Sequence, residues 1–440
     1  MRMRRSCARR ALVLISYLVV CSFALAEGAD PSLARQFIAE GIRLVQQERL
    51  AEAADRFRRA MAADPSNADA ANDLGIVLRR QRDFQDAIAA FETARRLRPE
   101  EARIQSNLAL ALDDMGRVAE AVATMQRAYA LQPANTTIQQ NLCRLQCRLG
   151  EEFAAKGDLK NAETQFRSAA EIAGDNYEPH ELLGGTLVET GDLDGAEREL
   201  RRAIELQPAS GRAHRDLGVV LWRRNQLDEA AAELHKALEV IPDDMGVHYA
   251  LGRVLQKTGA REQAAVELKK AQELNQRAQN AILAKTYNTS ATKLLQEGNF
   301  KEASAKLQEA LRLDPQSAAV HYNYGVALFE MNHFEQAIAE LGSSLSLNAD
   351  QADAYYYLGR AALAMGQPAA AAKDLEQGLR LNGRDARAHN IRAIALAELH
   401  EYPEASKELQ AAVEEEPGNG TFRDNLDCLE RRVAGCTLQQ

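Results

Sequence analysis

Histidine is the residue whose spacing in this 440-residue sequence most directly suggests chemistry, because five copies recur at one place of a repeating 34-residue unit. They are His180, His214, His248, His321 and His389. The ligands of one zinc ion lie about 2 Å from the metal, whereas equivalent residues of successive helical units are about 8 to 10 Å apart. Tyr287 and Tyr355 occupy the same place in other units. We therefore predict half-buried packing positions and no metal ion.

Cysteine offers a second possible chemistry, and four of the six cysteines lie beyond residue 26. Cys143 and Cys147 share one face of a helix with their Cβ atoms pointing the same way, which is poor disulfide geometry. Cys428 and Cys436 would be about 12 Å apart along an unbroken helix. A bridge between them requires the helix to end early, so it is left open beside the alternative of unbridged core thiols.

No enzyme motif accompanies these residues. The sequence has no phosphate-binding loop, nucleophile elbow, HExxH or CxxC motif, and its serines and carboxylates are scattered. We predict that the protein is not an enzyme and has no catalytic residue and no cofactor.

The elements that position these residues are clearest in residues 211–244, where apolar residues recur at i, i+3, i+4 and i+7, the period of two amphipathic helices. The pattern is carried by Leu217, Gly218, Leu221, Leu227, Ala230, Leu234, Ala237 and Pro242. Gly218 and Ala230 are small where two helices must cross closely, and Pro242 ends the second helix. Places are counted below from the first residue of each repeat, which is Gly211 here.

This pattern resembles the tetratricopeptide repeat, and eleven copies can be counted over residues 34–419. The resemblance implies an all-α, right-handed α-α superhelical solenoid of about eleven helical hairpins, with a C-terminal capping helix. It also implies a protein-binding scaffold whose first helices line a concave groove. The tenth copy has Gly359 and Gly378 and lacks the closing proline, so we predict that it is the weakest repeat.

The N-terminal 26 residues differ in kind from the repeats. Five arginines precede an apolar run, and Ala24, Leu25 and Ala26 form a small-x-small cleavage signal. This is typical of a secretory signal peptide; the alternative, an uncleaved anchor, would need about 20 apolar residues to span a bilayer. Cleavage would remove the five arginines and change the formal net charge from -9 to -14. A negative charge of this size argues against binding to nucleic acid and adhesion to anionic lipid. We predict a periplasmic or secreted protein with no membrane span after cleavage.

Two breaks in the period divide the array. Residues 136–142 and 279–283 are extra, and residues 275–295, without proline, are predicted to form one lengthened helix. The predicted segments are a cleaved signal peptide (1–26), a short lead (27–33), repeats one to three (34–135), repeats four to seven with an extended junction helix (136–278), repeats eight to eleven (279–419), and a capping helix with a tail (420–440).

Candidate binding residues lie on the face that first helices of the family present to the groove. In the sixth and seventh repeats they are Arg212, Arg215, Trp222, Arg223, Tyr249, Arg253 and Lys257. In the ninth to eleventh they are Tyr322, Asn323, Tyr356 and Arg360, with Arg387 and Asn390. The same face of the third and fifth repeats carries Asp113, Glu178, Glu181 and Glu189, which suggests that charge is sorted along the array.

Cations and aromatic residues on an acidic protein predict that an extended acidic or carboxylate-terminated segment of another protein binds this face. The alternative is that the arginines solvate a helix face and that Trp222 packs against the next repeat. The leading hypothesis is a scaffold or adaptor of the cell envelope, for which self-association is possible. The alternatives are a chaperone-like accessory protein of secretion or polysaccharide export, and a module that binds a small molecule or sugar.

Overall fold

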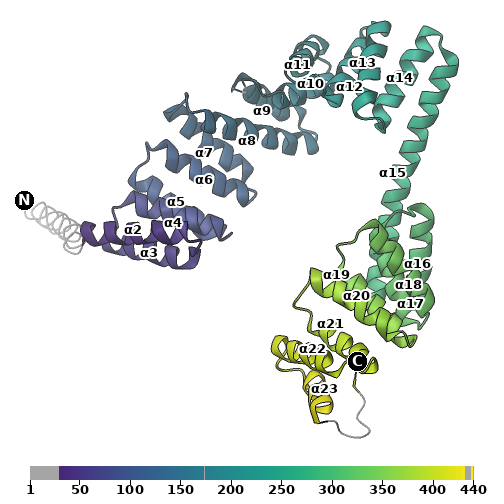
Figure 1. The fold of residues 1–440 in the computed structure, drawn as a ribbon. Coiled ribbons are helices and arrows are strands. Elements are labelled where there is room, and N and C mark those ends of the chain that lie inside the picture. The colour runs from purple at the N-terminus through teal and green to yellow at the C-terminus, as the bar shows by residue number, and fades with distance from the viewer. Residues whose placement is uncertain (1–28, 173, 432–437, 440) are drawn as a thin grey trace, which may run out of the picture. The chain divides into compact units, whose positions relative to one another are not determined.

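The computed structural model describes residues 29–172, 174–431 and 438–439, and they contain helices but no strand. Two compact units are present, unit 1 up to Leu268 and unit 2 from Lys269 onward. The predicted all-α fold of about eleven helical hairpins is confirmed (Figure 1). The predicted signal peptide, residues 1–26, lies outside the described residues, as does Cys436.

Each hairpin of unit 1 pairs two consecutive helices. The helices are α2 (Pro31–Gln46), α3 (Leu50–Ala63), α4 (Ala68–Arg80), α5 (Phe84–Leu97), α6 (Ala102–Asp114), α7 (Val118–Leu131), α8 (Thr136–Ala155), α9 (Leu159–Ile172), α10 (Glu178–Thr190), α11 (Leu193–Leu206), α12 (Gly211–Arg223), α13 (Leu227–Val240) and α14 (Met245–Thr258). Helix α15 (Arg261–Gln296) begins in unit 1 and continues into unit 2. Its 36 residues include the stretch predicted to form one lengthened helix.

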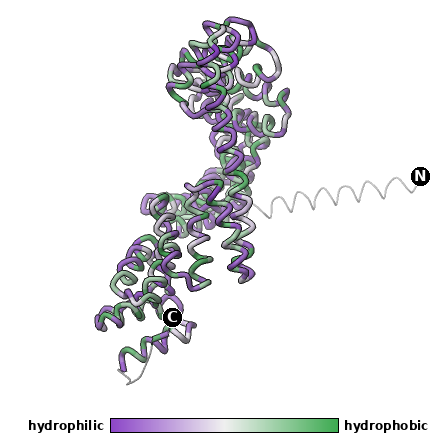
Figure 2. Tube along the Cα trace, turned by 90° about the vertical axis from the view of Figure 1, so that its right-hand side faces the viewer, coloured by the Kyte–Doolittle hydropathy of each residue, from purple (hydrophilic) through white to green (hydrophobic). Residues whose placement is uncertain are grey.

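Unit 2 continues the same order of paired helices. They are α16 (Phe300–Leu313), α17 (Ala318–Glu330), α18 (Phe334–Leu347), α19 (Ala352–Ala364), α20 (Pro368–Leu381), α21 (Ala386–Glu398), α22 (Tyr402–Glu415) and the capping helix α23 (Gly420–Arg431). Hydrophilic and hydrophobic residues alternate along the helical coils (Figure 2), and none of the described helices is long and apolar enough to cross a membrane.

The core of each hairpin is made by small residues that let its two helices approach. A Cβ added to Gly75 of α4 would lie 2.6 Å from the ring of Phe91 in α5, so only glycine fits there. Ala230 and Ala237 of α13, in the second helix of another hairpin, are also fully buried. The period that predicted the repeats therefore follows from the contacts within a hairpin.

A second set of buried residues packs each first helix against the preceding repeat. In most repeats places 3 and 10 are small or apolar, as with Ala213 and Val220 of α12, which have no exposed surface. The first repeat departs from this rule, because its places 3 and 10 are the exposed residues Gln36 and Arg43. Repeat eight departs from it in the same way, with exposed Thr286 and Lys293 in α15. Repeat eight thus has the surface of a first repeat.

The cysteines behave differently from one another. Cys143 and Cys147 of α8 are free and buried, among the apolar residues that α8 buries. Cys428 of α23 is disulfide-bonded.

Candidate binding face

Successive first helices lie next to one another within each unit, and some of the predicted residues lie on the surface that these helices share. In unit 1, α8, α10, α12 and α14 are such helices, and α10 contacts α12 while α12 contacts α14. In unit 2, α17 contacts α19 and α19 contacts α21. We call this surface the first-helix face and describe it separately for each unit.

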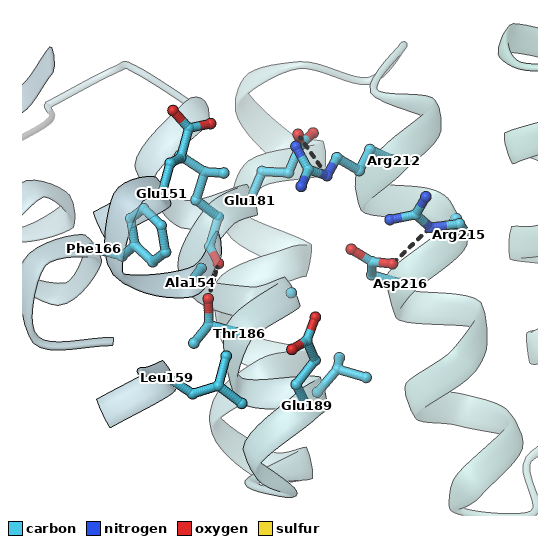
Figure 3. Close-up of a pocket in the computed structure, with 13 residues that line it drawn as sticks. Glu151, Ala154, Leu159, Phe166, Glu181, Thr186, Glu189, Arg212, Arg215 and Asp216 are labelled. Carbon is cyan, nitrogen blue, oxygen red and sulfur yellow. Dashed lines mark hydrogen bonds and ion pairs between the residues drawn. The ribbon is translucent and has the colours of Figure 1, made fainter. Parts of the chain in front are cut away.

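A cavity of about 310 Å³ opens on the first-helix face of unit 1 (Figure 3). Arg212 and Arg215 of α12 line it opposite Glu181 and Glu189 of α10. Arg212 is mostly exposed, and its Nε lies 3.9 Å from a carboxylate oxygen of Glu181. This distance leaves the Arg212 guanidinium only weakly paired, so it is accessible to a further anion.

Arg215 is held more firmly than Arg212. Its Nε lies 2.8 Å from Asp216 and its Nη1 lies 3.3 Å from Asp244. Burial by itself would lower the pKa of Arg215, but hydrogen bonding to Asp216 and the nearby charges of Asp216 and Asp244 raise it. Arg215 therefore remains charged and has its carboxylate partners within the protein.

The other predicted residues of unit 1 divide into packed and accessible ones. Trp222 is half-buried against the apolar core, and its Nε1 is buried without a hydrogen-bond partner among the described residues. Arg223 donates a hydrogen bond to the carbonyl of Val188 at 2.6 Å. Tyr249 is 50% exposed, and Arg253 and Lys257 are exposed cations. Helix α14 thus carries the most accessible part of the predicted set.

Some charges on the first-helix face of unit 1 are paired between successive first helices, which the sequence interpretation did not anticipate. The buried carboxylate of Asp113 in α6 accepts from Arg144 at 2.9 Å and from Arg148 at 2.5 Å, both in α8. Two arginines of α8 thus neutralise the acid of α6, whereas Arg212 is only weakly paired with Glu181. Because arginine side chains reach across a helix spacing, the sign of one helix does not give the sign of the surface.

In unit 2 a cavity of about 280 Å³ is lined by Tyr356 and Arg360 of α19 with Arg387 and Asn390 of α21. The guanidinium of Arg360 lies 4.6 Å from the ring centre of Phe329 and 5.5 Å from that of Tyr356. Its Nε is buried and has no hydrogen-bond partner among the described residues. Arg360 is thus a cation that lies on two aromatic rings and has no carboxylate partner among the described residues.

Arg387 faces the same cavity with its charge partly satisfied. Its guanidinium lies 4.9 Å from the ring centre of Tyr356, and its Nη2 lies 2.9 Å from Asp385 and 3.3 Å from Asp353. The hydrogen bonds that Arg387 donates to Asp385 raise the pKa of Arg387. Tyr322 lies outside this cavity, and its ring meets that of Tyr357 edge-on with 6.2 Å between the ring centres. Burial raises the pKa of Tyr322.

Asparagine pairs are a feature of this face that the sequence reasoning missed. Asn323 donates from Nδ2 to Oδ1 of Asn288 at 2.8 Å, and Asn107 donates to Asn72 in the same way at 2.9 Å. In each pair the donor follows the acceptor by 35 residues, from place 5 of one repeat to place 6 of the next. A comparison of identical places, 34 residues apart, does not align the two partners.

The histidine series is explained by pairing within each hairpin. Every Nδ1 lies 2.5 to 2.7 Å from a carboxylate oxygen 19 residues later. The pairs are His180 with Glu199, His214 with Glu233, His248 with Glu267, His321 with Glu340 and His389 with Glu408. The histidines are buried or half-buried, and among the described residues no group of histidine, cysteine and carboxylate side chains has the arrangement of a metal site.

Comparison with known proteins places these hairpins in context. Tetratricopeptide repeat models match residues 38–83, 72–136, 181–244 and 358–420, and a second such model matches residues 294–363. No curated protein sequence matches the chain significantly.

The chain is also similar to several solved structures at low identity. Yeast Tom70 is 15% identical, with 91% of this chain and 96% of that chain covered and a TM-score of 0.31. The complex of Naa15 and Naa10 bound to HypK-THB gives 16% identity, 95% and 70% coverage, and a TM-score of 0.40. The Pseudomonas aeruginosa protein pilF is 19% identical, with 56% of this chain and 95% of that chain covered and a TM-score of 0.27.

Proposed function

The chain belongs to the tetratricopeptide repeat family, and from that premise we propose that it is an exported, non-enzymatic scaffold that binds extended acidic segments of other proteins on its first-helix faces. Protein binding is the common role of the family's repeats. The acidic character of the partner is argued from the cations on these faces, and export from the N-terminal 26 residues.

The observation that carries the proposal is Arg360. The guanidinium of Arg360 lies on two aromatic rings and has no carboxylate partner among the described residues, so its Nη groups are the donors left for a carboxylate of a partner protein. Its Nε is buried and cannot be reached by such a partner. In unit 1, the exposed cations Arg253 and Lys257 and the weakly paired Arg212 offer the same chemistry. A carboxylate-rich segment satisfies these donors, whereas a basic segment would leave them unpaired.

The test uses a panel of labelled eight-residue peptides that are rich in aspartate and glutamate, in glutamine, or in lysine, each with a free or an amidated end. We expect the mature chain to prefer the acidic peptides, with an affinity that falls as salt rises. The substitutions Arg212→Ala, Arg215→Ala and Arg253→Ala together, or Arg360→Ala alone, should weaken that binding about tenfold, which equals about 1.4 kcal/mol.

The matched control removes three exposed arginines from second helices, namely Arg59→Ala, Arg202→Ala and Arg312→Ala, and so changes the net charge by the same amount as the triple variant. If the control weakens acidic-peptide binding as much as the face variant does, the effect is one of overall charge and the proposed face is wrong. Equal binding of acidic and glutamine-rich peptides would remove the proposed specificity.

A further inference from the structure

One place on the first-helix face of unit 2 already holds a short segment of this chain, Leu438–Gln439. Gln439 lies against α21 and α23, where its backbone N–H donates to Oδ1 of Asn425 at 2.8 Å. Nδ2 of Asn425 donates to the carbonyl of Gln439 at 2.7 Å, and Nδ2 of Asn390 donates to the same carbonyl at 3.1 Å. Both backbone hydrogen-bonding groups of Gln439 are therefore satisfied by asparagine side chains.

The contact is tightly built. Asn390 and Asn425 are 1% and 2% exposed, and Asn425 also donates to Oδ1 of Asn390 at 2.8 Å. The neighbouring Leu438 packs against the apolar cluster formed by α19, α20, α21 and α22. These contacts are made to the backbone of residue 439 and to the side chain of Leu438, so they do not depend on the side chain of Gln439.

The other asparagine pairs show what this place looks like without a segment. Asn107 and Asn323, the counterparts of Asn425, are half-buried, whereas Asn72, the counterpart of Asn390, is as buried as Asn390. No backbone group in the described residues donates to Asn107 or Asn323. Asn390 also lines the cavity that contains Arg360 and Arg387. A foreign segment that entered this cavity and used Asn390 would therefore meet Gln439.

We propose that the segment Leu438–Gln439 is an intramolecular occupant of the first-helix face of unit 2 and competes there with extended segments of partner proteins. This inference rests on the proposed function, since it makes the same face the partner's site. Because the contact is made mainly through the backbone, another chain in extended conformation can replace it without a matching sequence. When the chain's own segment occupies the face, a partner binds only the chains in which the face is free. The apparent affinity for the partner is then the intrinsic affinity multiplied by the fraction of such chains.

The test adds a labelled peptide with the sequence of residues 434–440 to three full-length chains. Gln439→Pro removes the backbone N–H that donates a hydrogen bond to Asn425. Gln439→Ala keeps this N–H and serves as the matched control. We expect the peptide to bind the Gln439→Pro chain at least about tenfold more tightly than the wild type or Gln439→Ala, because a tethered segment acts at an effective concentration of the order of mM. Adding Asn425→Ala to Gln439→Pro should abolish the gain.

A fold control and a second measurement accompany this comparison. Thermal unfolding of the Gln439→Pro chain should match that of the wild type, and the amide of Gln439 should exchange slowly in the wild type but rapidly in Asn425→Ala. Equal peptide affinity for all three chains, or rapid exchange of the Gln439 amide in the wild type, would overturn the inference.

The acidic peptides separate the inference from the proposed function. If they bind the wild type and the Gln439→Pro chain equally, the proposed function stands and the competition is wrong. If the 434–440 peptide prefers the Gln439→Pro chain while acidic peptides bind no chain, the occupant stands and the proposed partner chemistry is wrong.

Discussion

Two glycine-to-alanine substitutions in one hairpin should change its stability in opposite directions. Gly359 of α19 and Gly378 of α20 both lie in the tenth repeat, where alanine would favour the helix by about 1 kcal/mol. A Cβ on Gly359 would lie 2.4 Å from Cγ of Leu375, a fully buried side chain. Overpacking of this kind costs about 1 to 3 kcal/mol, so Gly359→Ala should destabilise the hairpin by up to about 2 kcal/mol.

Gly378 has more room than Gly359. Its added Cβ would lie 3.1 Å from Cβ of Tyr355 and 3.2 Å from the carbonyl oxygen of Ala352, which requires a shift of a few tenths of an ångström rather than a rearrangement. Most of the helix preference should therefore be realised, and Gly378→Ala should stabilise the repeat by somewhat less than about 1 kcal/mol.

Hydrogen exchange of peptides from residues 352–381 measures both effects on local opening. A change of about 1 kcal/mol alters the opening equilibrium about fivefold, and about 2 kcal/mol alters it about thirtyfold. In the wild type this repeat should open before the second one, α4 and α5. Slower exchange in Gly359→Ala than in the wild type would refute the packing argument, and a wild-type tenth repeat that is the best protected region would refute its assignment as the weak repeat.

Three further predictions concern a titration, the core and export. The hydrogen bond with Glu408 raises the pKa of His389 above its usual 6.5, so its stabilisation is present below pH 6.5 and is lost as pH rises through the raised value; an NMR titration of His389 should show this, and Glu408→Gln should return the pKa toward 6.5. Val220→Lys should destabilise unit 1 by at least about 2 kcal/mol because it buries a charge between repeats, whereas Lys293→Val should change stability by less than about 0.5 kcal/mol; urea unfolding compares them. The intact mass of the protein isolated from the envelope should correspond to cleavage after Ala26, and retention of residues 1–26 would contradict the cleavage prediction.

The sequence predicts the hairpins well because their contacts depend on residue size at fixed intervals. Gly75 and Ala230 occupy places where two helices leave no space, and such places recur every 34 residues. Ion pairing was not predictable in this way, since Asp113 is neutralised by arginines of another repeat whose long side chains have many possible partners. The contact of Gln439 left no signal at all, because backbone groups are the same in every residue.

The exposed Thr286 and Lys293 have a consequence for how the gene can change. A first helix that carries polar residues at these two places does not need a repeat in front of it. The part of the chain that the structure describes has two such helices, the other with Gln36 and Arg43. Duplication or loss of a 34-residue repeat after the first helix of repeat one, or after that of repeat eight, changes the number of repeats that follow that helix. It leaves the other of these two first helices intact. Each array can therefore acquire its own number of repeats, and its own length of binding surface, by separate genetic events.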